Sequence, residues 1–308
     1  MKTPSYWQTE NLLSRILSPI SWIYGRITQY RLNHASPYHC KAKVICIGNI
    51  TAGGVGKTPV SLALAEQYQK SGKKVFFLTR GYKGKLKNIV VDLNNHTAEE
   101  TGDEARLLAN TAPTIISPNR AEGAKLAEKA GAEIVIMDDG FQNPGLYKDE
   151  SWLVFDGGIG IGNGRIIPSG PLRETLANGL KRADKILIMG EDKTNLASQI
   201  SSLPIYQGKV IPEPLTLKNK KVLAFAGIGH PQKFYRTLRD IGCEVILTQD
   251  FPDHYQYKDT DIADLISRAK AQNLALVTTE KDFVKLSDKQ KKNINVLKIK
   301  ASWKLLKK

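Results

Sequence analysis

Residues 49–59, NITAGGVGKTP, decide how the rest of this chain folds. They follow the apolar run 44–47 and precede a helical pattern that begins at Pro59. A buried strand, a glycine-rich turn, Gly-Lys-Thr and a helix, in this order, predict a phosphate-binding loop. Glycines let backbone N–H groups approach a polyphosphate without Cβ clashes, and the start of the helix adds partial positive charge.

The loop departs from the usual pattern, which has glycine where this chain has Thr51. The remaining glycines still supply the turn, as in the variant loops of signal-recognition and partitioning NTPases, but those ATPases carry a further lysine at the position of Ala52. A glycine-rich turn that binds nothing is the alternative. Lys57 is predicted to neutralise the β- and γ-phosphates of a bound nucleotide, and Thr58 to ligate Mg²⁺. The predicted nucleotide-binding residues are Thr51, Ala52, Gly53, Gly54, Val55, Gly56, Lys57 and Thr58.

Composition restricts the class of protein. A length of 308 residues suggests two domains. The net charge of +15 suggests a polyanionic partner, such as nucleic acid, an anionic membrane or a phosphorylated substrate, although part of it lies in a lysine-rich tail. Because no known nucleic-acid module is recognisable, we expect no nucleic-acid partner. The three cysteines form no metal-spaced pair or disulfide framework, so we expect a cytoplasmic protein.

Strand and helix patterns alternate from residue 44 to about residue 189, which predicts an α/β fold. The expected architecture is a P-loop NTPase-like, mostly parallel sheet with helices on both faces, and ligands bind beyond the carboxyl ends of such strands. Further buried strands are predicted at 75–78, 114–116, 134–137, 153–155 and 186–189, and helices at 59–71, 103–110 and 120–130.

The predicted domain organisation has four parts. Residues 44–203 form the P-loop domain, the proline-containing stretch 204–220 is a linker, and residues 221–308 form a smaller C-terminal α/β domain. Residues 1–43 are basic and aromatic, and their apolar run is too short and too broken to span a bilayer. They predict an amphipathic segment that associates with a membrane surface; a helix packed on the protein's own core is the alternative.

Two adjacent carboxylates, Asp138 and Asp139, end the predicted strand 134–137. A carboxylate at this position in a phosphate-binding-loop enzyme holds Mg²⁺ opposite the hydroxyl of Thr58, directly or through water. The alternative is a helix cap or an Asp turn. The pair is therefore predicted to bind metal, and which of the two contacts the ion stays open.

Asp103 opens a predicted helix, and from the residues alone a helix cap is the favoured role. The functional alternative is a general base that takes the proton of an attacking hydroxyl. His254 follows a strand in the second unit, where an isolated histidine is usually a surface turn residue. It can share the base function only if the two domains close and bring it to Asp103.

Basic residues flank the predicted ligand side of the sheet. Arg173 is a candidate phosphate clamp, and Arg80 and Lys83 are candidates for binding an anionic substrate, with solvated charge as the alternative. Residues 279–282, TEKD, are similar to base-reading loops of nucleotide-binding proteins, which is a weak signal by itself.

Taken together, these stretches resemble the tetraacyldisaccharide 4′-kinase family, the lipid A 4′-kinases of lipopolysaccharide synthesis. The similarity covers nearly the whole chain in the family's order. The matching stretches are 48–59, 80–82, 102–104, 138–142, 170–174, 251–254 and 279–282.

The resemblance implies a kinase that uses ATP and Mg²⁺ to phosphorylate the 4′-hydroxyl of tetraacyldisaccharide 1-phosphate, a lipid A disaccharide, giving lipid IVA. It places Asp103 and His254 on the family's catalytic pair with Lys57, and it implies substrate-binding roles for Arg80, Arg173 and Glu174. It also implies peripheral or monotopic association with the cytoplasmic face of the inner membrane. The alternative is a membrane-associated P-loop regulatory ATPase without a small-molecule acceptor, against which Ala52 counts.

Overall fold

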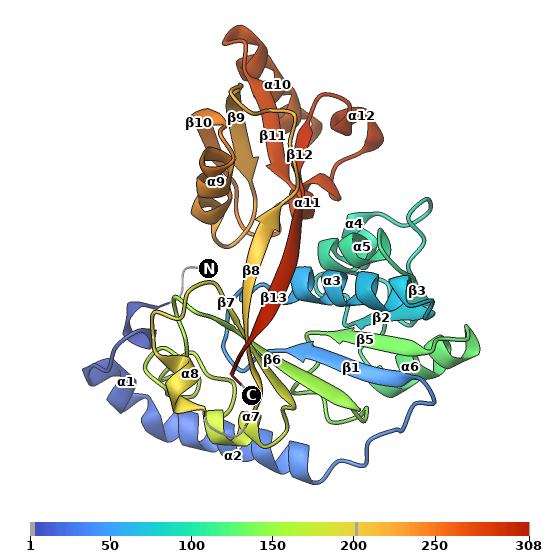
Figure 1. The fold of residues 1–308 in the computed structure, drawn as a ribbon, viewed down its shortest axis with the longest axis vertical. Helices are drawn as coiled ribbons and strands as arrows, with labels where there is room; N and C mark the ends of the chain where they lie inside the picture. Colours follow the sequence, from blue (N-terminus) through green and yellow to red (C-terminus); the bar gives the residue numbers. More distant parts are fainter. Residues whose placement is uncertain (1–3, 201–202, 308) are drawn as a thin grey trace.

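The computed structural model describes residues 4–200 and 203–307, and within them the strands form one nine-stranded and one four-stranded sheet (Figure 1). The order in the large sheet is β13-β8-β7-β6-β1-β5-β2-β4-β3. Its pairs are parallel except β13–β8 and β3–β4, at the two edges. Its strands are β1 (Lys43–Gly48), β2 (Val75–Thr79), β3 (Ile89–Val90), β4 (Thr114–Ile116), β5 (Ile134–Asp138), β6 (Glu150–Asp156), β7 (Lys185–Met189), β8 (Ile205–Pro212) and β13 (Ile299–Lys307).

The central strands of the large sheet are buried on both faces. Alternate residues of β1 belong to different cores: Ile45 and Ile47 pack with α3 (Lys57–Lys70) and α5 (Asp103–Ala109). Val44 and Cys46 pack in the core that includes α6 (Arg120–Lys129), α7 (Leu176–Leu180) and α8 (Leu196–Gln199). Strands covered on both sides have continuous apolar sequences. The predicted α/β fold with helices on both faces is confirmed. The short α4 (Ala98–Thr101) precedes α5.

The four-stranded sheet is entirely parallel, in the order β10-β9-β11-β12. Helix α9 packs Phe234 and Leu238 into one core, and α10 packs Ile262 and Leu265 into another. Its elements are β9 (Lys221–Ala226), α9 (Pro231–Asp240), β10 (Glu244–Asp250), α10 (Asp259–Ala271), β11 (Ala275–Thr279), α11 (Glu280–Phe283), α12 (Asp288–Lys291) and β12 (Asn295–Leu297).

The prediction of a linker at 204–220 is wrong for residues 205–212, which form β8 of the large sheet. The end of the chain, expected in the C-terminal unit, returns as β13 and pairs antiparallel with β8. Pro212 is the last residue of β8, at a strand end where proline is tolerated. The two strands run between the sheets (Figure 1). The sequence of the whole four-stranded unit lies between these two strands, so no local pattern could reveal their pairing.

The N-terminal segment contains η1 (Ser5–Trp7), α1 (Leu12–Ile16) and α2 (Ser18–Asn33). In α2 a polar side chain is buried and the large apolar side chains are exposed. Helix α2 buries Ser21, whose Oγ donates to the Ile166 carbonyl at 2.8 Å. Its large apolar side chains are exposed instead, for example Trp22 at 66% and Ile27 at 57%. Among the described residues, no helix has the length and apolar character needed to cross a bilayer. The alternative that this segment packs its apolar stripe on the protein's own core is therefore wrong.

Glu150, the first residue of the interior strand β6, provides a test of how the amino ends of the central strands are stabilised. Burial raises its pKa, but hydrogen bonds from Lys185, Lys43 and Trp152 outweigh burial and lower the pKa from 4.5 to about 2. A carboxylate whose pKa is lowered in the folded state stabilises the fold when the pH is above its ordinary pKa. This contribution disappears as the pH falls through the pKa of the folded state. We expect Glu150→Gln to lower the free energy of unfolding by about 1–2 kcal/mol near neutral pH, allowing for solvent screening.

Urea denaturation of the wild type and Glu150→Gln, from neutral pH down to the lowest pH at which the wild type folds, tests this prediction. The stability difference should shrink steadily as the pH falls from 4.5 towards 2. Glu122→Gln is the matched control, because Glu122 forms an exposed pair with Lys125 on α6. A difference that is independent of pH would show that Glu150 contributes through packing alone.

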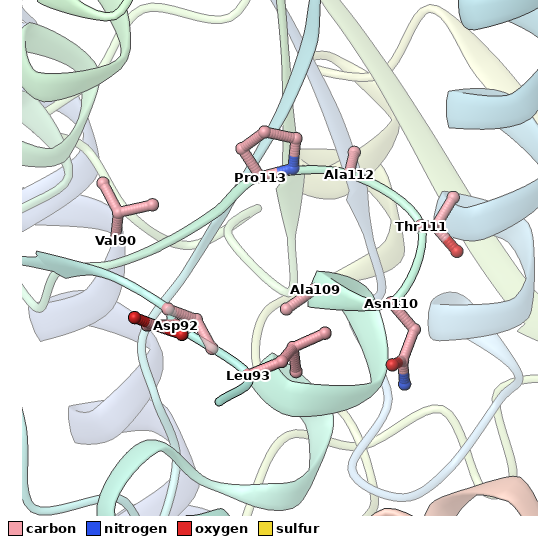
Figure 2. A pocket seen from close by; sticks show the side chains of 9 residues that line it. Val90, Asp92, Leu93, Ala109, Asn110, Thr111, Ala112 and Pro113 are labelled. Carbon is pink, nitrogen blue, oxygen red and sulfur yellow. The ribbon is translucent and has the colours of Figure 1, made fainter. Parts of the chain in front are cut away.

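A surface hollow of about 530 Å³ lies between β3, the end of α5 and the residues before β4 (Figure 2). It is at the amino end of β4, whereas the phosphate loop follows the carboxyl end of β1. Helix α5 begins at Asp103 and contributes only its far end, at Ala109, to this hollow. The hollow therefore lies at the amino ends of the parallel strands, whereas the predicted site lies at their carboxyl ends.

Candidate active site

The loop between β1 and α3 has the backbone geometry of the predicted turn. Gly53 (φ +121°) and Gly56 (φ +87°) have positive φ angles, which side chains disfavour. One hydrogen bond from outside and one within the loop brace it: Ala52 N–H donates to the Pro171 carbonyl at 2.7 Å, and Asn49 Nδ2 donates to the Thr51 carbonyl at 2.6 Å. Thr51, the departure from the usual pattern, is buried and forms a β-bridge to Leu172.

Lys57, the first residue of α3, is held over the carboxyl ends of the central strands. Its Nζ lies 3.2 Å from Asn49 Oδ1 and 3.4 Å from Asp139 Oδ1. Only 11% of its side chain is exposed. The ammonium group is thus fixed beside the loop rather than solvated.

Asp138 ends β5 and faces α3. Thr58 Oγ1 donates to its Oδ2 at 3.1 Å, and Ser61 Oγ donates to its Oδ1 at 2.8 Å. Burial, followed by the negative charge of Glu104, raises the pKa of Asp138 to about 7. Carboxylate and hydroxyl oxygens side by side are hard donors of the type that Mg²⁺ prefers.

Asp139 has a different environment, although it is the next residue. Its backbone is left-handed (φ +55°), and Lys57 and Arg173 both lie 3.4 Å from its Oδ1. Burial raises the pKa of Asp139, but the two cations outweigh burial and hold it below the ordinary value. Asp138 therefore faces hydroxyl groups, and Asp139 faces cations.

Asp103 and His254, which lie 151 residues apart in the chain, are in direct contact. His254 Nδ1 lies 2.8 Å from Asp103 Oδ2, and the two side chains are only 11% and 3% exposed. The helix cap predicted at Asp103 is wrong: Gly102 is the N-cap of α5, and Asp103 is its first helical residue. Burial raises the pKa of Asp103, but the hydrogen bond from His254 and the charge of Lys281 outweigh burial and leave the pKa below its ordinary value.

A second contact joins the two sheets beside this pair. Lys281 Nζ, from α11, lies 3.1 Å from Glu104 Oε1, from α5. The labels of α11 and α5 are close together in Figure 1, in agreement with contacts between these helices. The charge of Glu104 also acts on Asp138, so the contact between the sheets and the phosphate loop belong to one site.

The predicted substrate residues lie around this site in different environments. Arg173 Nη1 is within 3.4 Å of both Asp139 Oδ1 and Gln142 Oε1. Glu174 is 2% exposed, accepts from Gln142 Nε2 at 3.0 Å and pairs with Arg182. Arg80 follows β2 and is exposed. The Glu174 carboxylate is thus engaged within the protein, and its role in substrate binding stays a prediction.

Lys83 and Tyr82 follow Arg80 in the loop beside the Asp103–His254 pair. Lys83 has φ +62° and its Nζ lies 6.0 Å from the centre of the Tyr82 ring. The same ring meets His254 edge-on, with 5.5 Å between the ring centres. This loop, which follows β2 of the nine-stranded sheet, therefore borders His254.

Sequence reasoning missed several residues that complete the site. They are polar side chains that hold a predicted residue in place. Ser61, Arg120 and Arg182 lie outside the matching stretches of the sequence, whereas the other residues lie inside those stretches but were given no role. Arg120, for example, is 4% exposed at the start of α6, and its charge acts on Asp139. The missed residues are Asn49, Ser61, Tyr82, Glu104, Arg120, Gln142, Arg182 and Lys281.

Comparison with known proteins assigns the family. The model of the LpxK family, Tetraacyldisaccharide-1-P 4′-kinase, matches residues 13–308. Tetraacyldisaccharide 4′-kinase from Rhodospirillum centenum is 42% identical over 313 residues, covering 98% of this chain and 93% of that protein. The enzyme of the same name from Rhodospirillum rubrum is 42% identical over 309 residues, again covering 98% and 93%.

A solved structure agrees with these relatives over the whole fold. The crystal structure of LpxK from Aquifex aeolicus in complex with ATP has a TM-score of 0.80 and 29% identity, and it covers 95% of this chain and 96% of that chain. Family model, relatives and fold all extend over both sheets. The chain therefore belongs to the LpxK family of tetraacyldisaccharide-1-P 4′-kinases.

Proposed function

We propose that this protein transfers the γ-phosphoryl group of ATP to the 4′-hydroxyl of a tetraacyldisaccharide 1-phosphate, giving lipid IVA in lipid A biosynthesis. The observation that carries the proposal is the contact between Asp103 and His254 beside a phosphate-binding loop. Phosphoryl transfer needs a positioned nucleotide, charge neutralisation and an oriented hydroxyl. Family membership supports this activity over a regulatory ATPase without an acceptor.

The loop and Lys57 are proposed to hold ATP. Backbone N–H groups of the turn and of the first turn of α3 would donate to the β- and γ-phosphates. Lys57 already lies between Asn49 and Asp139, and it needs only to exchange the Asp139 carboxylate for phosphate oxygens. The Aquifex aeolicus relative, crystallised with ATP, supports the choice of nucleotide.

Thr58, Asp138 and Asp139 are proposed to hold Mg²⁺. Among the described residues, no three His, Cys, Asp or Glu side chains form a complete metal site. The residues present nevertheless fit Mg²⁺, because the Thr58 hydroxyl of α3 lies 3.1 Å from Asp138 at the end of β5, and Asp139 follows directly. These groups supply oxygen donors, and Mg²⁺ takes further oxygens from phosphates and water. When bound, the ion would neutralise charge on the phosphates.

Asp103 is proposed to accept the proton of the 4′-hydroxyl. The oxygen of that hydroxyl forms a bond to the γ-phosphorus, the bond to the bridging oxygen of ADP breaks, and the proton passes to the Asp103 carboxylate. The lowered pKa keeps this carboxylate ionised at neutral pH. His254 orients the carboxylate through Nδ1 and supports the charge during transfer.

Arg80, Arg173 and Glu174 are proposed to border the substrate. Arg173 is within reach of Asp139 and so of the phosphate side of the site. Arg80 lies two residues before Tyr82, whose ring touches His254. Glu174 is buried, so it would contribute indirectly, by holding Gln142 and Arg182 in position.

Helices α1 and α2 are proposed to lie on the cytoplasmic surface of the inner membrane, where the acylated substrate resides. The exposed apolar residues of α2 recur at helical spacing, and Arg26 lies over the Trp22 ring at 5.6 Å. A helix with an apolar face and flanking basic residues binds anionic membrane surfaces. The exposed apolar residues of both helices are Leu12, Leu13, Ile16, Ile20, Trp22, Ile23, Tyr24, Ile27 and Tyr30.

Replacing Ile16, Ile20, Ile23 and Ile27 together by glutamine is expected to weaken binding to phosphatidylglycerol-containing vesicles by about 100-fold or more. The reason is that these side chains are exposed in the protein and have only the acyl region in which to bury. Vesicle flotation measures the bound fraction. The control replaces exposed apolar residues of the β8 and β10 strands, Val210, Ile211 and Ile246, by threonine. Equal flotation of both variants would contradict the proposed membrane face.

Transfer of label from γ-labelled ATP to purified tetraacyldisaccharide 1-phosphate in detergent micelles tests the kinase proposal. We expect labelled lipid with this acceptor and none with lipid IVA, whose 4′-position is already phosphorylated. Chelation of Mg²⁺ should abolish the labelling. ATP hydrolysis without labelled lipid, from a folded protein, would instead favour the regulatory ATPase.

A further inference from the structure

Residues 279–282, the TEKD stretch, connect three separate parts of the molecule. Glu280 accepts a hydrogen bond from the backbone N–H of Ile299, the first residue of β13, at 3.0 Å. Lys281 reaches across to Glu104 of the large-sheet unit. Asp282 points the other way, into its own unit. This single helical turn therefore contacts β13 at Ile299, α5 at Glu104, and the turn after β9 at Gly227.

Asp282 is fully buried, and three hydrogen-bond donors and one lysine ammonium group surround its carboxylate. Oδ2 accepts from Gly227 N–H at 3.1 Å and from Thr279 Oγ1 at 2.7 Å. Oδ1 accepts from Tyr257 OH at 2.9 Å and lies 2.6 Å from Lys285 Nζ. An ionised carboxylate offers about four lone-pair positions; hydrogen bonds occupy three of them here, and the Lys285 ammonium group compensates the charge.

Two of these donors lead directly to His254. Gly227 donates to Asp282 through its N–H, and its carbonyl accepts from His254 N–H at 3.1 Å. A Cβ at Gly227 would lie 3.0 Å from Tyr257 OH and 3.1 Å from Asp282 Oδ1, so the close approach needs glycine. Tyr257 lies three residues after His254 in the same loop. Asp282 thus holds this loop directly at Tyr257 and, through Gly227, at His254.

The loop needs holding, because His254 has φ +62°, in the left-handed region. A non-glycine residue keeps this conformation only where its surroundings impose it. The constraint sets the direction of the ring whose Nδ1 lies 2.8 Å from Asp103 Oδ2. A change in the loop would therefore move the ring away from Asp103.

We propose that Asp282 is a positioning residue that holds loop 252–257 so that His254 faces Asp103. The inference rests on the proposed kinase function, within which TEKD is a support for the histidine rather than a base-reading loop. The simpler role for Asp282 is a buried ion pair with Lys285 that stabilises the second unit without any effect on His254. Because the simpler role involves Lys285 and the proposed role involves Gly227 and Tyr257, variants can separate them.

The main test compares two tyrosines of the same loop. Tyr257→Phe removes the hydroxyl that bonds Asp282, and Tyr255→Phe removes one that bonds Asp261 on α10 at 3.1 Å. We expect Tyr257→Phe to lower kcat for lipid phosphorylation about three- to tenfold, with KM for ATP unchanged. Tyr255→Phe should retain wild-type kcat. Equal effects of the two substitutions would overturn the proposal.

A double-mutant cycle asks whether the effect passes through His254. If it does, Tyr257→Phe should lower kcat much less in a His254→Ala background than in the wild type. Full additivity of the two substitutions would mean that Tyr257 acts elsewhere, which would overturn the proposal.

A measurement independent of catalysis uses the ¹³Cε1 NMR signal of His254, identified by its loss in His254→Ala. This signal should shift in Tyr257→Phe and stay in place in Tyr255→Phe. Asp282→Asn with Lys285→Met removes the buried charges together, so the fold should survive in thermal melts while the signal still shifts. An unchanged signal in that variant would show that Asp282 serves only as the ion-pair partner of Lys285 and would overturn the positioning role. If the wild type phosphorylates no lipid, the kinase proposal fails, and the NMR result still decides the positioning role.

Discussion

Replacement of Asp103 by asparagine is expected to lower kcat for phosphoryl transfer by about 10²–10⁴-fold, because the variant loses the proton acceptor. Asparagine keeps the shape of the side chain and an oxygen that can accept from His254 Nδ1, so the contact between the domains should persist. Initial rates with labelled ATP and the disaccharide acceptor measure the loss. Thermal melting measures whether the fold is retained.

The pH dependence of this effect follows from the environment of Asp103. The hydrogen bond from His254 and the charge of Lys281 overcome burial and lower its pKa. The carboxylate is therefore ionised at neutral and mildly acidic pH, and its protonation should produce no loss of rate in that range. Glu99→Gln, an exposed carboxylate on α4, is the control and should retain activity. Full activity of Asp103→Asn would return Asp103 to a purely structural role at the start of α5.

Replacement of Lys57 by methionine is expected to lower kcat by about 10²–10³-fold, since the γ-phosphoryl group would lose its fixed cation during transfer. The aliphatic part of the side chain is enclosed, with 11% exposed, and methionine preserves that packing. Asp139 would retain Arg173 as a partner. Turnover measured at saturating ATP separates this loss from weaker nucleotide binding.

Lys70→Met is the matched control for Lys57→Met. Lys70 is the last residue of the same helix, α3, and it is exposed. Its replacement removes one positive charge from the same element without touching the loop, so kcat should stay within about twofold of the wild type. If both variants lost activity equally, the loss would reflect net charge, and the assignment of Lys57 to the phosphates would be wrong.

The parts of the site that are local in sequence could be predicted without a structure. The phosphate loop was identifiable because the run 44–47, the glycines and Gly-Lys-Thr all act within a few turns of one another. Asp138 and Asp139 followed because the end of a parallel strand next to the loop strand must lie at the same edge. The difference between these two aspartates was not predictable. It depends on Ser61, which faces Asp138, and on Arg173, which faces Asp139.

The second unit shows where local patterns fail. The stretch 205–212 has polar and partly exposed positions and ends in proline, so it has the character of a linker. It is a strand because the last residues of the chain pair with it. Residues 279–282 likewise carry only a short polar motif, and their contacts involve Glu104, Gly227 and Ile299.

By itself, the sequence determined the α/β class, the phosphate-binding loop, the carboxylates beside that loop and the basic, aromatic character of the N-terminal segment. Each depends on residues close together in the chain, where helical or strand geometry decides which side chains are neighbours. That the apolar side chains of the N-terminal segment are exposed was seen only in the structure. Only the tertiary structure decided that Asp103 meets His254 and that Lys281 meets Glu104, contacts that join residues 151 and 177 positions apart. Such contacts depend on how two independently buried cores are oriented by β8 and β13, and no local pattern specifies that orientation.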